Sequence, residues 1–278
     1  MNNKLYIGDN LEIMRSLPNE SVDLIATDPP FYSRKNYQEF DDRWSSLEEF
    51  IEFMRLRLIE MHRLLKPTGS IYLHLNQSAS HYIKIEMDKI FGTDQFVNDI
   101  IWTYAVNGRP PKYGFPKKHD NILFYRKSSI STFNRLYQDI PKDAYKKFSK
   151  TDEDGRKYKV YTKAHAKKKY LDEYKGIPIP SYWTDIISFS SCAQSKERTG
   201  YPTQKPIKIY NRIIKASSNE GDLVLDPFAG SGTTLDAAQS LNRCWIGIDK
   251  NPNAVNYIKK RFDDRYGLLN PNYEVIHE

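Results

Sequence analysis

Two aspartates stand on either side of a glycine-rich turn near the C-terminal end of the chain. Asp226 ends the apolar run Leu-Val-Leu, and Gly230 and Gly232 follow it in the segment Asp-Pro-Phe-Ala-Gly-Ser-Gly. Glycines at such a turn let backbone N–H groups and a helix N-terminus approach a ligand closely. The next apolar run, residues 243–248, ends in Asp249. In doubly wound sheets, an acid at the end of this second strand accepts hydrogen bonds from the ribose hydroxyls of the ligand. The pattern therefore predicts a ligand that contains adenosine.

The spacing at this turn excludes two common nucleotide-binding motifs. A dinucleotide site needs Gly-x-Gly-x-x-Gly, whereas Gly232 is followed by Thr-Thr-Leu. A P-loop needs Gly-Lys-Ser or Gly-Lys-Thr, and neither occurs here. For this stretch taken by itself, an ordinary tight turn between a strand and a helix stays an alternative.

A third aspartate lies far away in the sequence, directly after the apolar run 22–27. It opens the segment Asp28-Pro29-Pro30-Phe31. Proline fixes the backbone, so the plain structural interpretation is a rigid turn after a strand. The same rigidity would also hold the Asp28 carboxylate and the Pro29 carbonyl in a fixed arrangement beside a substrate.

Together these stretches resemble the amino-methyltransferases of DNA. Asp-Pro-Pro-Phe is similar to the catalytic motif of that family, and Asp-Pro-Phe-Ala-Gly-Ser-Gly is similar to its S-adenosylmethionine motif. Thr203-Gln204-Lys205-Pro206 is similar to a third motif, which also contacts the cofactor. The catalytic motif comes first and the cofactor motifs last, an order that resembles the permuted class called beta. The resemblance covers about two thirds of the chain and says little about residues 127–200.

The resemblance implies S-adenosyl-L-methionine as the cofactor, and it implies a role for each matching residue. The implied catalytic residues are Asp28, Pro29, Pro30 and Phe31. The implied cofactor-binding residues are Asp9, Asn10, Lys205, Asp226, Phe228, Gly230, Gly232, Thr233 and Asp249. We expect no metal site, because the six histidines form no pair at metal-ligand spacing and methyl transfer from a sulfonium needs no metal.

The chemistry that the resemblance implies is the methylation of an exocyclic amine on a nucleobase. Such an amine is a poor nucleophile, and Asp28 and the Pro29 carbonyl would each accept one of its N–H groups. The base must leave the duplex, and Phe31 is placed to stack on it. Because relatives that carry Asp at the position of Asp28 mostly modify adenine, the resemblance favours N6 of adenine. Three alternatives stay open: N4 of cytosine, an RNA or protein substrate, and a methyltransferase-like subunit that binds DNA without catalysis.

The positive charge of the chain is concentrated in one segment. The whole chain has 42 Lys and Arg against 35 Asp and Glu, a net charge of +7. Residues 126–175 hold 15 basic and 7 acidic residues, a net of +8, and tyrosines lie between the lysines. The segment predicts a surface for phosphates and bases, although a charge run of this kind is also typical of a solvated face.

Apolar periodicity predicts seven strands alternating with helices, an α/β fold. The resemblance implies that the strands form a doubly wound, mostly parallel Rossmann-like sheet of seven strands with a circularly permuted order of motifs. The predicted strands begin near residues 4, 22, 70, 99, 121, 222 and 243. The resemblance implies that the strands at 99–104 and 121–125 form the antiparallel pair at the end of the sheet. Predicted helices follow at 47–65, 79–91, 206–216 and 233–240, among others. The predicted domain organisation is a catalytic half (1–126), a target-recognition region (127–200) and a cofactor-binding half (201–278).

Two connections carry polar residues close to the predicted site. Residues 32–44 predict a mobile loop beside Phe31 that could close over an extruded base. Residues 107–119 are rich in Pro, Gly and Lys, and Arg109, Lys112, Lys117 and Lys118 suit either a DNA-facing or a merely exposed loop.

No signal peptide opens the chain and no apolar run approaches the length of a membrane span, so we expect a cytoplasmic protein. The expected partner is double-stranded DNA and no membrane is expected. A cognate restriction endonuclease and a homodimer both stay open as further partners.

Overall fold

The computed structural model describes residues 3–37, 39–105, 109, 111–138, 140, 142–160, 167–192 and 194–278. The chain forms two compact units. The larger unit consists of residues 1–134 and 181–278, and the smaller unit is the intervening segment Arg135–Pro180.

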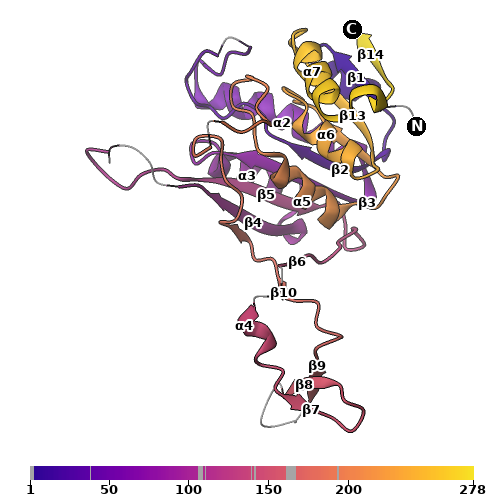
Figure 1. Ribbon diagram of the computed structural model, residues 1–278. Coiled ribbons are helices and arrows are strands. Elements are labelled where there is room, and N and C mark those ends of the chain that lie inside the picture. The colour runs from indigo at the N-terminus through magenta and orange to yellow at the C-terminus, as the bar shows by residue number, and fades with distance from the viewer. Residues whose placement is uncertain are drawn as a thin grey trace. The chain divides into compact units, whose positions relative to one another are not determined.

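A nine-stranded sheet runs through the larger unit in the order β11-β4-β5-β3-β2-β12-β13-β1-β14 (Figure 1). Its strands are β1 (Asn3–Ile7), β2 (Val22–Thr27), β3 (Leu65–Leu75), β4 (Phe96–Thr103), β5 (His119–Arg126), β11 (Tyr182–Trp183), β12 (Leu223–Asp226), β13 (Cys244–Asp249) and β14 (Tyr273–His277). All seven predicted strands are present. Two strands that the sequence did not indicate, β11 and β14, extend the sheet at its two edges.

The sheet is mostly parallel, as predicted. Strands β3, β2, β12, β13, β1 and β14 pair in parallel, and β11 pairs in parallel with β4. Strand β5 is antiparallel to both of its neighbours, β3 and β4. The predicted antiparallel pair of β4 and β5 is therefore confirmed.

Helices cover both faces of this sheet, which confirms the doubly wound fold (Figure 1). One face carries α1 (Asn10–Ser16), α2 (Leu47–Leu64) and α3 (Ser80–Phe91). The other carries α5 (Ile207–Ser217), α6 (Thr233–Ser240) and α7 (Ala254–Tyr266). Two 3₁₀ turns, η1 (Thr93–Gln95) and η2 (Gly267–Leu269), follow α3 and α7. In the part of the chain that the structure describes, no helix has both the length and the apolar character to cross a membrane.

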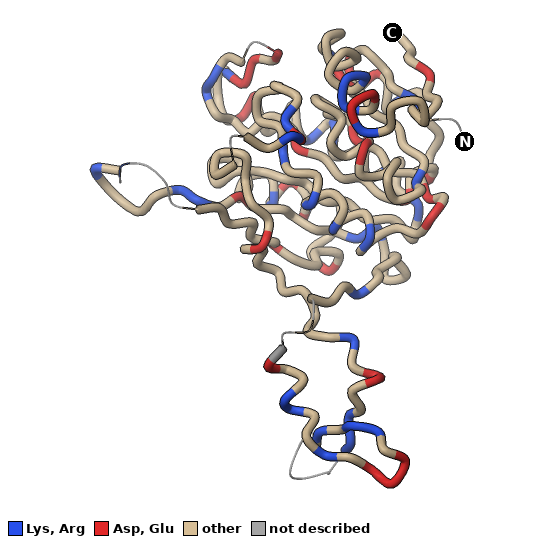
Figure 2. Tube along the Cα trace, in the orientation of Figure 1, with Lys and Arg blue, Asp and Glu red and all other residues tan. Residues whose placement is uncertain are grey.

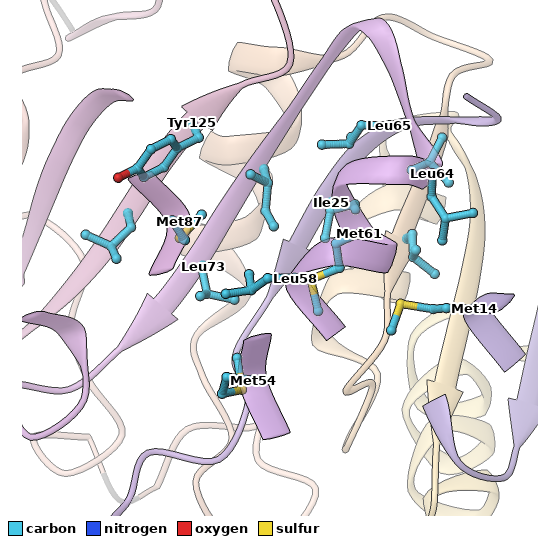
Figure 3. Close-up of a cluster of buried hydrophobic side chains, with 14 of the residues drawn as sticks. Met14, Ile25, Met54, Leu58, Met61, Leu64, Leu65, Leu73, Met87 and Tyr125 are labelled. Carbon is cyan, nitrogen blue, oxygen red and sulfur yellow. The ribbon is translucent and has the colours of Figure 1, made fainter. Parts of the chain in front are cut away.

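The apolar stripe of α2 packs on the sheet and forms the centre of the core (Figure 3). Met54, Leu58 and Met61, spaced by three and four residues, are fully buried against strand residues such as Leu73. Burial of each such side chain contributes about 1.5–3 kcal/mol. The helix ends at Leu64, earlier than Pro67, because the chain turns directly into β3. This packing holds the strand ends on which the site is built.

The smaller unit consists of short elements, and in its described residues Phe148 is the one buried aromatic side chain. It contains the antiparallel strands β7 (Lys150–Thr151), β8 (Lys157–Val160) and β9 (Lys168–Tyr170), the pair β6 (Tyr137–Gln138) and β10 (Ile177–Pro178), and the helix α4 (Lys142–Tyr145). Phe148 is 2% exposed, and Lys159 Nζ lies 4.6 Å from the centre of its ring. The unit falls inside the predicted target-recognition region, whose residues 127–134 and 181–200 belong to the larger unit. The assignment of that region to DNA recognition stays a prediction.

Candidate active site

Four neighbouring parallel strands of the sheet each deliver an aspartate to the same edge. In sheet order, β2 leads into Asp28, β12 ends in Asp226, β13 ends in Asp249, and β1 leads into Asp9. Their carboxyl ends coincide because the strands are parallel and adjacent. All four aspartates line one cavity of about 640 Å³. Residues that are more than 200 positions apart in the sequence therefore share one site.

This cavity contains nearly all of the residues predicted from the sequence. The predicted residues on its wall are Asp9, Asn10, Asp28, Pro29, Pro30, Phe31, Lys205, Asp226, Phe228, Gly230, Thr233 and Asp249. Gly232 is not on that wall. The structure thus brings the predicted catalytic and cofactor-binding residues together, while their individual roles stay predictions.

The glycine turn is held by Asp249. Its Oδ2 accepts a hydrogen bond from the backbone N–H of Gly230 at 2.7 Å, and its Oδ1 accepts one from Asn251 at 2.8 Å. Each oxygen keeps a further lone pair, so the carboxylate can still accept from a ligand. Burial raises the pKa of Asp249 above its usual range.

Gly232 has a packing role in the structure. It precedes α6 with a φ of 73°, a left-handed conformation that favours glycine. A Cβ atom at this position would lie 2.7 Å from Cγ1 of Ile258 in α7. The close approach of α7 therefore requires a glycine at this position. The implied role of Gly232 in cofactor binding stays a prediction.

Asp226 lies at the centre of the row of acids and is 2% exposed. Its Oδ1 accepts from the hydroxyl of Thr27 at 2.5 Å and from the backbone N–H of Phe228 at 3.1 Å. Burial raises the pKa of Asp226 to about 7, against the lowering effect of the Thr27 hydrogen bond. Asp226 therefore fixes β2 to the turn after β12 and also faces the cavity.

Asp28 is held from two sides. Lys205 Nζ donates to its Oδ2 at 2.7 Å, and the hydroxyl of Tyr210 donates to its Oδ1 at 3.1 Å. The Lys205 ammonium also donates to the carbonyl of Thr203 at 3.1 Å and lies 4.5 Å from the centre of the Phe31 ring. Lys205 stands two residues before α5, as predicted, but its charge is directed to Asp28. Its implied role in cofactor binding stays a prediction.

The loop after Phe31 is anchored by a buried carboxylate. Asp42 is 1% exposed and accepts hydrogen bonds from the backbone N–H groups of Phe31 (3.2 Å), Tyr32 (3.0 Å) and Ser33 (2.7 Å). These bonds hold Tyr32 at a φ of 57°, which is uncommon for an aromatic residue. In the described residues, the predicted mobile loop is thus tied to the segment that carries Phe31.

On the opposite side of the cavity, Arg57 links the first helix to the second. Its Nε donates to Asn10 Oδ1 at 2.6 Å, and its Nη2 lies 3.2 Å from Asp9 Oδ2. Asn10 in turn donates to the carbonyl of Pro227 at 2.7 Å, and the Arg57 guanidinium stacks 3.5 Å above the Phe53 ring. The side chain of Asn10 thus bridges α1 and the glycine turn.

Sequence reasoning missed Arg57, Tyr210 and Asp42. Arg57 had a signal, because it interrupts the apolar stripe of α2 between Met54 and Met61 and is 5% exposed. A charged residue on a buried helix face is rare unless it is paired. Tyr210 and Asp42 had no comparable signal. In the sequence, Tyr210 is an ordinary residue of the apolar face of a helix, and Asp42 is an ordinary polar residue of a loop.

A second cavity of about 800 Å³ adjoins the first, and Phe31, Tyr201 and Lys205 line both. Its wall includes the cations Lys35, Lys117 and Arg198 and the aromatic and acidic side chains Trp102, Tyr104 and Asp120. Asp120 is nearly buried; it accepts from the Tyr104 hydroxyl at 3.1 Å and lies 3.2 Å from His74 Nε2. Phe31 is therefore on the wall of both the acid-lined cavity and the cavity whose wall carries cations.

Comparison with known proteins agrees with this geometry. The DNA methylase family model for N6 and N4 enzymes matches residues 22–260. The type II methyltransferase M.HpaI of Haemophilus parainfluenzae is 32% identical over 96% of this chain and 76% of its own length. The DNA adenine methyltransferase YhdJ of Escherichia coli K12 is 31% identical over 92% of this chain and 81% of its own length.

Solved structures show the same fold. The cytosine-N4-specific PvuII DNA methyltransferase superposes with a TM-score of 0.66 at 19% identity, over 99% of this chain and 95% of that chain. TTHA0409 of Thermus thermophilus, in complex with S-adenosyl-L-methionine, gives a TM-score of 0.63 at 23% identity, over 99% of both chains. The acid-lined cavity, the matched family model and the curated relatives lead to one conclusion. The chain belongs to the N6/N4 family of S-adenosylmethionine-dependent DNA methyltransferases.

Proposed function

We propose that this protein transfers a methyl group to the N6 amine of an adenine that has been extruded from double-stranded DNA. The observation that carries the proposal is the position of Asp28. Its carboxylate lies at the end of β2, on the cavity wall beside Phe31, and is held by Lys205 and Tyr210. Such a fixed acceptor suits a substrate group that has N–H donors to offer.

The residues of the first cavity fit the cofactor in chemistry and in size. Asp249 presents acceptors for the ribose hydroxyls, and Asp9 stands at the far end of the row of acids, where an adenine amine would need an acceptor. Phe53 and Phe228, whose ring centres lie 6.3 Å apart, offer apolar faces for the adenine ring. When bound, S-adenosylmethionine supplies a methyl group on a positively charged sulfur. The surrounding carboxylates favour that charge.

Asp28 and Pro29 activate the amine. Each oxygen of the Asp28 carboxylate already accepts one hydrogen bond, and each retains a lone pair for an incoming N–H. The Pro29 carbonyl, fixed by two prolines, accepts the other N–H. The two acceptors draw the nitrogen towards tetrahedral geometry, so that its lone pair is no longer delocalised into the ring. A proton leaves the nitrogen when the new N–C bond has formed, and Asp28 is placed to take it.

The second cavity suits the extruded nucleotide. Phe31 offers a ring face at the junction of the two cavities, while Lys35, Lys117 and Arg198 provide positive charge on the wall for the phosphates beside the nucleotide. Unpairing a base costs a few kcal/mol, and stacking on an aromatic ring returns about 1–3 kcal/mol of that cost.

The choice of adenine over cytosine rests on resemblance. Asp28 matches relatives that modify adenine, and YhdJ is named a DNA adenine methyltransferase. The PvuII methyltransferase, which shares the fold, is named cytosine-N4-specific. The fold therefore does not distinguish an adenine-N6 enzyme from a cytosine-N4 enzyme. The test is to methylate duplex DNA with labelled cofactor, digest it to nucleosides and identify them by mass. We expect N6-methyladenine, and N4-methylcytosine as the sole product would contradict the proposal.

The segment 127–200, which contains the smaller unit, is proposed as the target-recognition region between a catalytic half (1–126) and a cofactor-binding half (201–278). Its support is the concentration of positive charge in residues 126–175. A cognate endonuclease is also proposed, because relatives such as M.HpaI and M.BglII are named type II methyltransferases. Restriction sensitivity of DNA from expressing cells, once the modified sequence is mapped, would test that pairing.

A further inference from the structure

The connection between β4 and β5 combines exposed aromatic rings with positive charge. Its sequence from residue 105 to residue 118 is AVNGRPPKYGFPKK, which contains four cations and no acid. Figure 2 shows the charge along this connection, which lies at the left of the view. Tyr113 is 82% exposed and Phe115 is 94% exposed. Two large rings of this exposure, with cations on both sides, suit a partner that offers both apolar faces and negative charge.

Two prolines restrict the backbone near the two rings. Pro111 and Pro116 flank the segment Tyr113-Gly114-Phe115 and fix φ at both of its ends. Gly114 has a φ of 78° and open space around it, so the turn is set by its own conformation and not by packing. Lys112 Nζ lies 5.3 Å from the centre of the Tyr113 ring. A segment restricted by prolines loses less conformational freedom on binding, so more of the contact energy remains as affinity.

The connection starts and ends on the wall of the second cavity. Tyr104, at its beginning, and Lys117 and His119, at its end, all line the cavity that Phe31 shares. A hydrogen bond of 3.0 Å from the Tyr104 N–H to the carbonyl of Lys118 closes the stem. The exposed rings therefore belong to a loop that leaves the protein from the wall of the proposed nucleotide cavity.

We propose that Tyr113 and Phe115 insert into the DNA duplex where the target nucleotide has left it, and stack on the bases that remain. This inference rests on the proposed function, since it supposes that a nucleotide is extruded into the second cavity. Extrusion leaves bases unstacked, and aromatic side chains replace that stacking without regard to sequence. Arg109, Lys112 and Lys118 then meet the phosphates on either side of the gap.

The test uses the full-length protein and two DNA substrates that carry the mapped target sequence. One is a perfect duplex, and in the other the target nucleotide stands opposite an abasic site. Tyr113→Ser/Phe115→Ser should lower kcat/KM on the perfect duplex by about tenfold or more. The variant lacks the two rings that stack on the remaining bases, so the state with the extruded nucleotide is less stable. On the abasic substrate, where the target nucleotide has no pairing partner and is extruded at a lower cost, the loss should be clearly smaller.

A matched control is Leu268→Ser/Leu269→Ser, which removes an equally exposed apolar pair, 106% and 87% exposed, in η2. It should leave both activities unchanged. Fluorescence of 2-aminopurine at the target position gives a second readout, and its rise on binding should be smaller for the loop variant than for the wild type. An equal loss on both substrates, or no loss on the perfect duplex, would overturn the inference. A wild-type protein that methylates neither substrate would instead overturn the proposed function.

Discussion

Asp249 is the residue on which recognition of the cofactor is expected to depend most. Its two oxygens hold Gly230 and Asn251 and also face the cavity. Asp249→Ala should weaken cofactor binding by about 10- to 100-fold, because a hydrogen bond to a charged group contributes about 1.5–3 kcal/mol. Calorimetric titration with S-adenosylmethionine measures this change. Asp263→Ala, an exposed carboxylate on α7, is the control, and unchanged affinity in Asp249→Ala would place the ribose elsewhere.

Asp226 makes stability depend on pH in an unusual direction for an aspartate. Burial raises its pKa in the folded chain to about 7, well above the unfolded value near 3.8. The folded state therefore binds the proton more tightly, and the stability from this group is fully present below about pH 3.8 and is lost as pH rises to about 7. Asp226→Asn, which mimics the neutral form, should be stabilised relative to wild type at pH 8 by up to about 4 kcal/mol.

Urea unfolding of both proteins between pH 5 and pH 8 checks this prediction. The difference in free energy of unfolding should grow between pH 5 and pH 7, by about 1.4 kcal/mol per pH unit, and should level off above pH 7. A difference that stays constant, or that shrinks as pH rises, would show that Asp226 is ionised throughout this range in the folded chain.

At the scale of elements, the loop of residues 31–43 depends on one carboxylate. Asp42 accepts three backbone N–H groups, and it holds the segment that positions Phe31. Asp42→Ala leaves those donors buried without partners, which costs about 1–3 kcal/mol for each donor that water cannot reach. We expect a loss of stability of a few kcal/mol, faster proteolysis within the loop and slower methyl transfer.

Asp41→Ala is the matched control for this prediction. Asp41 is the neighbouring residue, but it is exposed and pairs with the exposed Arg43. Exposed ion pairs contribute about 0–1 kcal/mol, so Asp41→Ala should leave the free energy of unfolding nearly unchanged. Equal effects of the two substitutions would mean that the loop is not organised by Asp42.

Elements with a buried apolar run could be predicted from the sequence, whereas edge elements could not. Strands β2, β12 and β13 follow continuous apolar runs, and α2 follows a spacing of three and four residues. Strand β14 is mostly exposed and β11 has two residues, so neither leaves a pattern in the sequence. The predicted site residues were found through motifs, but the partners of Asp28 could not be found that way. Tyr210 and Lys205 meet it through the packing of α5 on the sheet.

At the scale of the whole molecule, the lysines of the smaller unit are of two kinds: some lie over tyrosine rings of the unit, and others are exposed. Lys168 lies 4.8 Å from the ring centre of Tyr158, and Lys169 lies 4.8 Å from that of Tyr174. These lysines contribute to packing within the unit. Lys146 pairs with Asp143, and both of these side chains are highly exposed. Part of the interleaving of Lys and Tyr in the sequence is therefore explained by contacts inside the unit.

Neutralising exposed lysines of this unit should reduce the salt dependence of DNA binding. Lys146→Gln/Lys147→Gln/Lys167→Gln should lower the slope of log affinity against log salt by about 0.9 for each phosphate that is no longer neutralised. Lys215→Gln/Lys259→Gln/Lys260→Gln, on α5 and α7 of the larger unit, removes the same charge as a control. A slope equal to that of the wild type in the first variant would mean that these lysines serve solubility.

The central claim is that the Asp28 carboxylate acts on the substrate amine and not on the cofactor. The most direct measurement compares single-turnover methyl transfer to duplex DNA with calorimetric cofactor affinity for the wild type and Asp28→Ala, after unfolding curves show that both are folded. Transfer should fall by about 100-fold or more, as removal of one preorganised polar group typically causes, while cofactor affinity should stay nearly the same. Transfer close to that of the wild type would contradict the claim, as would a fall in transfer explained entirely by weaker cofactor binding.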